Sequence, residues 1–161
     1  MKTALRLALA LALAATGAQV IAATTTGNLA VNATVVATCR LTTTAVGFTN
    51  YDGLSGAATD GQGSLGVTCT QSAPYTIALD AGAHAALATA GARAMINATG
   101  QHLDYNLYSD SARGTLWGGT VTVPGSGNGA IQTVNVYGRV PANQSVPAGS
   151  YSDTVQVTVT F

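Results

Sequence analysis

The sequence predicts an all-β protein, an antiparallel sandwich of short strands. Three observations support this fold class. Short β-rich segments are separated by Gly, Asn, Asp and Pro, as in antiparallel sandwiches. No amphipathic helix of any length stands out, and the best helical candidate, Ala83–Ala94, is rich in alanine with poor periodicity. Residues 151–161 alternate polar side chains with a set expected to face the core: Tyr151, Val155, Val157, Val159 and Phe161.

The first residues are predicted to be a secretory signal peptide, residues 1–23. Lys2 and Arg6 give a positive start, an apolar Leu/Ala run follows, and cleavage is expected after Ala22 or Ala23. An uncleaved membrane anchor is the alternative, which the shortness of the apolar run disfavours. Secretion places the remaining residues in an oxidising compartment.

Residues 24–38 contain a second alternating segment, predicted as a strand over Leu29–Ala37. Small or polar residues separate its apolar side chains, which are Leu29, Val31, Ala33 and Val35. The connector 36–38 contains no Gly, Asn, Asp or Pro, so a tight hairpin back into the same domain is poorly encoded. The last strand, ending at Phe161, leaves its outer edge uncovered. One strand without a neighbour and one spare strand favour donation to another molecule. The alternative that stays open is a wider connection through which the segment returns to its own domain.

The remaining strands are predicted in one domain, residues 39–161. Breakers are expected at Tyr51–Gly63, Ala81–Gly91, Pro124–Gly129 and Pro141–Gly149, and Gly125–Gly129 is interpreted as a flexible hairpin loop. The pattern favours a sandwich over a βαβ fold. The predicted strands are Cys39–Phe48, Ser64–Thr70, Tyr75–Asp80, Ala94–Thr99, Leu103–Tyr108, Thr120–Val123, Ala130–Arg139 and Tyr151–Phe161.

Cys39 and Cys69 are predicted to form a disulfide, because an even cysteine count in an oxidising compartment favours pairing. A metal site would need further ligands, and no histidine lies close in sequence to either cysteine. After the signal peptide the chain has neither lysine nor glutamate, and its arginines are scattered singly. It therefore offers no basic face for nucleic acid or anionic lipid.

No residues suggest catalysis, a cofactor or a metal, and the sequence predicts a protein that is not an enzyme. His84 and His102 lack a partner constellation and are interpreted as ordinary surface histidines. The aspartates lie singly in turns and strand ends, where they commonly bond their own backbone. A carbohydrate-binding module using Tyr105, Tyr108 and Trp117 is a further alternative. Tyr105 and Tyr108 would face opposite sides of a strand, which favours core packing.

Several segments in order resemble one known family. They are Gly27–Val35 leading to Cys39, Ser64–Cys69, Tyr75–Gly82, Tyr105–Asp110, Arg113, Leu116–Gly118, Pro147–Thr154 and Val157–Phe161. Together they resemble the spore coat protein U domain family, which includes the subunits of archaic, Csu-type chaperone–usher pili. The resemblance spans nearly all residues after the signal peptide.

The resemblance implies an incomplete immunoglobulin-like antiparallel β-sandwich, completed by a donated strand. The partners would be a periplasmic chaperone, an outer-membrane usher and other pilin subunits, in a fibre at the cell surface for adhesion and biofilm formation. Carried onto this sequence, the donor side chains are Leu29, Val31, Ala33 and Val35, and the acceptor edge is Val155, Val157, Val159 and Phe161. Ala33 is smaller than expected, which predicts a shallow pocket or a weaker joint. The alternative is a non-polymeric spore coat or envelope protein of the same fold.

Overall fold

The computed structural model describes residues 21–87 and 93–161. Most of the predicted signal peptide, and part of the helical candidate Ala83–Ala94, lie outside the described residues. The chain divides into two units, residues 1–34 and 35–161. Residues 21–38 carry no assigned strand, so the predicted strand Leu29–Ala37 is absent from the chain on its own. A strand is defined by its hydrogen-bonded neighbour, which this segment lacks here.

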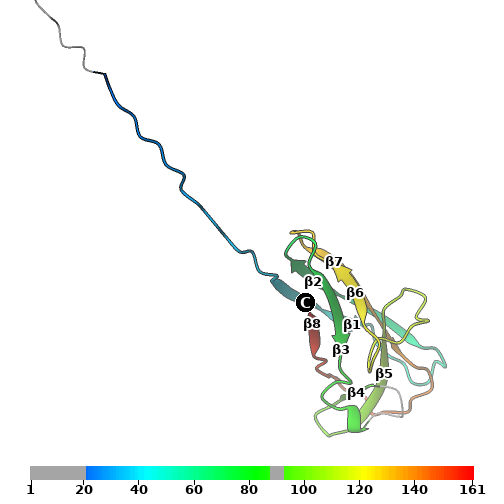
Figure 1. Cartoon of the computed structure of the whole chain (residues 1–161). Coiled ribbons are helices and arrows are strands. Elements are labelled where there is room, and N and C mark those ends of the chain that lie inside the picture. The colour runs from blue at the N-terminus through cyan, green and yellow to red at the C-terminus, as the bar shows by residue number, and fades with distance from the viewer. Residues whose placement is uncertain (1–20, 88–92) are drawn as a thin grey trace, which may run out of the picture. The chain divides into compact units, whose positions relative to one another are not determined.

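The second unit consists of two antiparallel sheets (Figure 1). The larger sheet has the order β1-β2-β7-β5-β4, and the smaller one has the order β6-β3-β8. This arrangement confirms the predicted all-β class. The strands are β1 Cys39–Phe48, β2 Thr59–Cys69, β3 Pro74–Leu79, β4 Arg93–Ile96, β5 His102–Tyr108, β6 Val123–Ser126, β7 Gln132–Val140 and β8 Val157–Thr160.

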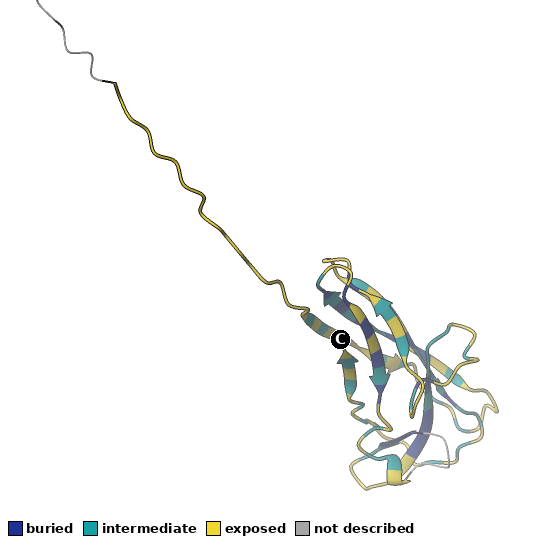
Figure 2. Ribbon diagram, viewed as in Figure 1, coloured by how far each residue is buried: buried dark blue, intermediate teal, exposed yellow. Residues whose placement is uncertain are grey.

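The core lies between the two sheets, where alternate residues of β2 and β3 are buried (Figure 2). Trp117, from the connection between β5 and β6, is completely buried and joins the layers. Its indole N–H donates to the carbonyl of Ile77 at 3.3 Å, and its backbone N–H donates to Leu107 at 2.8 Å. Within the described residues, the only helical turn is the 3₁₀ segment η1, Ala85–Leu87, and no helix is long and apolar enough to cross a bilayer.

The predicted bounds of β1 agree with the structure at both ends, and those of β3, β4, β5 and β7 differ by a few residues. Strand β2 begins at Thr59, inside the stretch expected to be a break, because Gly61 and Gly63 lie within it rather than in a turn. The last strand is shorter than predicted. Of residues 151–161, only Val157–Thr160 form β8, and Ser152 makes an isolated bridge to Ile96.

The prediction for β6 is wrong. The strand was expected at Thr120–Val123, yet it covers Val123–Ser126 and includes Pro124 and Gly125 from the expected loop. Gly125 pairs with Tyr75 of β3, and the Tyr75 ring occupies the space where a side chain at 125 would lie. The glycine here permits close packing and is not a turn signal. Gly127 is also structural, since its N–H donates to Ala73 at 2.8 Å.

Candidate functional site: an apolar groove beside the last strand

An open groove of about 1170 Å³ runs into the sandwich between β1 and the segment that leads into β8. Residues 43–54 form one wall, and residues 144–155 together with Val157 form the other. The floor consists of core side chains from both sheets: Leu65, Leu79, Met95, Leu103, Tyr105, Leu107, Val136 and Val140. A ligand in this groove would therefore contact the hydrophobic core directly.

The β1 wall is irregular. Pairing with β2 runs without interruption from Cys39↔Cys69 to Thr44↔Ser64, and it resumes only at Gly47↔Gln62. The extra residues between form a β-bulge, a feature that bends a strand and redirects its side chains. Val46 within the bulge and Phe48 just beyond it are half-buried and pack against the core cluster.

The opposite wall is held from one side. Ser152 exchanges backbone hydrogen bonds with Ile96 of β4, at 2.9 and 3.0 Å. Thr154 and Gln156 then accept from the N–H groups of Ala83 and Asp80, at 2.9 and 3.0 Å. Strand β8 continues this line by pairing with β3, with Val157 opposite Leu79 and Val159 opposite Ile77.

Of the four described strands that lie at sheet edges, β1, β4, β6 and β8, two flank the groove. Among the described residues, β1 pairs only with β2, and β8 pairs only with β3. Each therefore has one row of N–H and C=O groups free of strand pairing, and these strands flank the groove. Unpaired edges accept additional strands, which hydrogen-bond to the rows and place alternate side chains in the pockets between them.

A buried polar cluster lies beneath the wall formed by residues 144–155 and Val157. The Asp153 carboxylate, 2% exposed, accepts from the Tyr105 hydroxyl at 2.7 Å and is 2.8 Å from Nδ1 of His84. Burial, followed by the hydrogen bond to Asp153, raises the pKa of Tyr105, so its hydroxyl stays a donor. Nearby, Arg93 donates to the carbonyls of Asp80 and Trp117, at 2.6–2.9 Å. Burial lowers the pKa of Arg93.

This cluster corrects part of the interpretation of the histidines and aspartates. His84 is half-buried and joined to Asp153, although they are far apart in sequence, whereas His102 is exposed as predicted. Asp52, Asp80 and Asp110 bond nearby backbone N–H groups as predicted. Asp153 differs because the fold, rather than a local turn, supplies its donors.

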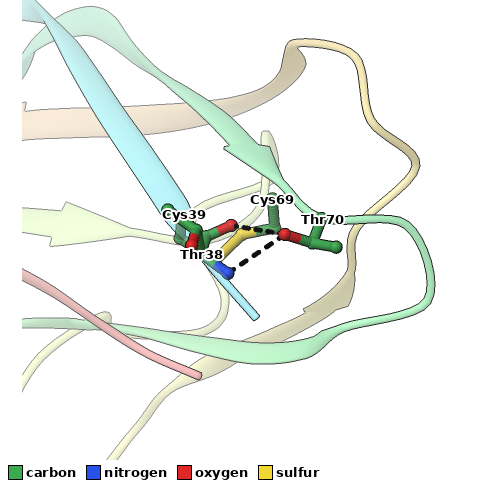
Figure 3. Close-up of a disulfide and its surroundings, with 4 residues drawn as sticks. All are labelled: Thr38, Cys39, Cys69 and Thr70. Atoms are coloured by element: carbon green, nitrogen blue, oxygen red, sulfur yellow. Dashed lines mark hydrogen bonds between the residues drawn. A yellow bond between two sulfur atoms is a disulfide. The ribbon is translucent and has the colours of Figure 1, made fainter. Parts of the chain in front are cut away.

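The predicted disulfide is present. Cys39 and Cys69 are joined, and they are also the first residue pair of β1 and β2 (Figure 3). One residue earlier, Thr38 continues the pairing: its N–H donates to Oγ1 of Thr70 at 3.0 Å, and its carbonyl accepts from the N–H of Thr70 at 2.9 Å. The N-terminal segment therefore leaves the folded unit at a covalently fixed point.

The structure separates the residues predicted to form the acceptor edge. Val155 and Val157 line the groove, Val159 packs against the core opposite Ile77, and Phe161 is 56% exposed. On the N-terminal segment, Leu29, Val31 and Val35 are 87, 84 and 83% exposed, and Ala33 is also exposed.

Sequence reasoning did not find the β1 wall, because residues 43–48 were assigned only as a strand. The bulge depends on non-local contacts and has no clear local signal. Two of the three aromatic candidates for sugar binding are core residues: Tyr105 and Trp117 are buried, so neither offers a ring face to a surface sugar, and Tyr108 is half-buried. Within the described part of the chain, no group of three or more His, Cys, Asp or Glu side chains could hold a metal.

Comparisons with known proteins agree with this architecture. The sequence model of the Spore Coat Protein U domain matches residues 25–158. Protein U of Myxococcus xanthus is 39% identical over 155 residues, which cover 87% of each chain.

Solved structures resemble the fold. A chain of the CsuC–CsuE chaperone–tip adhesion subunit pre-assembly complex, from the archaic chaperone–usher Csu pili of Acinetobacter baumannii, superposes with a TM-score of 0.58 at 27% identity. The match covers 80% of this chain and 40% of that one. A chaperone–tip adhesin complex of CFA/I fimbriae is more distant, with a TM-score of 0.46 and 12% identity over 72% of this chain and 38% of that one. The fold is the immunoglobulin-like antiparallel sandwich, and the chain belongs to the Spore Coat Protein U domain family.

Proposed function

We propose that this chain is a structural, pilin-like subunit that polymerises by donating its N-terminal segment to the groove of the next copy. The observation that carries the proposal is the groove itself, with an apolar floor and an unpaired strand edge on each side. In this proposal residues 24–38 are the donor segment, residues 39–161 are the acceptor domain and residues 1–23 are a removed signal peptide.

The chemistry of the donor segment complements the groove. Its alternating side chains would enter the core from one face of a strand, while its backbone satisfies the free edges of β1 and β8. Burying Leu29, Val31 and Val35 contributes on the order of 5–9 kcal/mol, before ladder hydrogen bonds and ordering costs. A joint of this kind separates only when the whole strand is removed.

The geometry of donation favours a fibre. The donor segment and the groove are different surfaces, so each copy can bind one neighbour through each. Contacts of this heterologous kind continue indefinitely unless they close into a ring. We infer a fibre exported through the periplasm to the cell surface, where it serves adhesion and biofilm formation.

A chaperone and an usher are proposed as assembly partners. The subunit cannot expose an apolar groove in the periplasm without risk of aggregation, so a transient occupant is needed. The similar Csu structure is described as a complex of a chaperone with a tip adhesion subunit, and this chain spans 40% of the length of the matched chain. This likeness supports a periplasmic chaperone as the transient occupant.

The first test appends a second copy of residues 28–35 after Phe161, through a short flexible linker. We expect the wild-type chain, produced without a partner, to aggregate or be degraded, and the extended chain to be a soluble monomer. A matched control carries Val31→Asn in the appended copy, which places an amide in the apolar groove and should abolish the rescue. Size-exclusion chromatography measures whether each chain is a monomer, and thermal unfolding measures its stability. Equal behaviour of the extended and wild-type chains would contradict the proposal.

The alternative is a non-polymeric coat or envelope protein in which the N-terminal segment completes its own sandwich. The family name, Spore Coat Protein U, is the observation that favours it. Deleting residues 23–35 distinguishes the two. Under donation between copies, polymers disappear and the truncated domain still accepts an added donor. Under self-completion, the wild-type chain is already a stable monomer and the deletion unfolds it.

A further inference from the structure

The inner face of the large sheet has a stretch without side chains. In β2 the inward positions near its start are Gly61 and Gly63, and in β7 the inward position opposite Gly61 is Gly138. All are buried, so other groups cover them. Glycines in strand interiors commonly mark such a close approach.

The covering groups come from β1 of the same chain. A Cβ atom added at Gly138 would lie 2.6–2.8 Å from the Phe48 ring and 2.8 Å from Cγ1 of Val46. A Cβ at Gly63 would lie 2.6 Å from the Thr44 carbonyl oxygen. The bulge between Thr44 and Gly47 is what brings this part of β1 over the glycines.

Phe48 reaches across the sheet. Its ring centroid is 6.2 Å from that of Tyr105 in β5, with an edge-on angle of 68°. Tyr105 belongs to the groove floor, and Phe48 belongs to the groove wall. The Phe48 ring therefore narrows the groove at the level of the glycines.

The donor segment has a matching irregularity. Leu29, Val31 and Val35 are large, whereas Ala33 carries a single methyl group. A groove of uniform depth would leave an unfilled space beside Ala33, and such a space costs stability. A groove already narrowed by an aromatic ring would instead require a small residue there, because overfilled cores are destabilised.

We propose that Phe48 occupies one side-chain position of the groove and that Ala33 of a second copy packs against its ring, which fixes the register of the inserted strand. This inference rests on the proposed strand donation. A shift of two residues would press Val31 or Val35 on Phe48, and a shift of one would turn the apolar side chains to solvent. Phe48 is thus a residue that determines which donor sequences fit.

The test is a size exchange in the chain that carries the appended copy of residues 28–35. Ala33→Leu in the appended copy should lower the melting temperature by roughly 5 °C through overpacking. Phe48→Ala in the domain should also lower it, by leaving a cavity. Combined, the two changes should give a melting temperature above that of Phe48→Ala alone, because the leucine fills the space that the ring leaves.

Two further variants make the result specific. Val31→Leu in the appended copy adds volume at another position, so Phe48→Ala should not rescue its loss. Phe48→Leu leaves a smaller cavity and replaces Phe48→Ala if that variant does not fold. It should partly rescue the stability lost in Ala33→Leu. Additive losses for Ala33→Leu with both Phe48 variants, or equal rescue of Val31→Leu, would overturn the assignment.

The same chain separates this inference from the proposed function. If the unmodified appended copy yields no soluble, stabilised monomer, strand donation itself is wrong and the register falls with it. If that copy stabilises the domain while the size exchange shows no coupling, donation stands and only the role of Phe48 and Ala33 is contradicted.

Discussion

At the scale of single residues, Asp153 links the groove wall to the domain core. Its buried carboxylate receives the Tyr105 hydroxyl from β5 and contacts His84 from the connection before η1. A buried carboxylate that lost its donors would cost considerable free energy. The cluster therefore fixes the position of residues 151–155, which form the wall that an inserted strand would contact.

We predict that Tyr105→Phe lowers the free energy of unfolding by roughly 1.5–3 kcal/mol, the range for a hydrogen bond to a charged group. Urea unfolding of the chain with the appended copy measures the change. Tyr108→Phe, on the opposite face of the same strand, is the matched control and should change stability by less than about 0.5 kcal/mol. Equal losses in both variants would show that the Asp153 hydrogen bond contributes little.

At the scale of elements, the disulfide compensates for the exposed position of β1. As an edge strand with a bulge, β1 has partners on one side only, and its pairing begins at Cys39↔Cys69. A strand paired on one side only opens locally at lower cost than one paired on both sides. The covalent bond prevents opening from the end where the N-terminal segment emerges.

Replacing both cysteines by alanine should lower the free energy of unfolding by roughly 3–4 kcal/mol, from the loop closed over a sequence separation of 30. Amide hydrogen exchange should also quicken in residues 39–44 of β1 more than in β7, because β1 is an edge strand whose end the disulfide fixes and β7 is paired on both sides. Uniform acceleration across the domain would mean that the disulfide acts on global stability alone.

Elements that depend on local pattern could be predicted from the sequence, and elements that depend on contacts between distant residues could not. Strand β1 follows directly from its alternation and the cysteine at its start. The position of β6 was predicted wrongly because Gly125 was interpreted as a loop residue. The reason for this glycine is the Tyr75 ring, which packs against it and lies far away in sequence. The groove was predicted on its β8 side, where alternation is visible, and missed on its β1 side, where a bulge places Phe48.

At the scale of the whole molecule, the low charge and the unpaired edges of β1 and β8 favour association. Charged side chains are few, some of them pair with each other, as Arg139 does with Asp60 at 2.7 and 2.9 Å, and little repulsion opposes contact between copies. The proposed donor segment and the groove then give the assembly a direction, since each copy has one of each.

This polarity predicts a chain terminator. A subunit with the appended copy has a filled groove, yet it keeps a free N-terminal donor segment. Added to wild-type subunits during assembly, it should occupy the last open groove and stop growth, so fibre length falls as its fraction rises. Electron microscopy measures the lengths. The same chain with Leu29→Asn and Val31→Asn in its N-terminal segment should leave lengths unchanged, because its donor no longer fits an apolar groove. Equal shortening by both chains would mean that growth does not proceed by insertion of this segment.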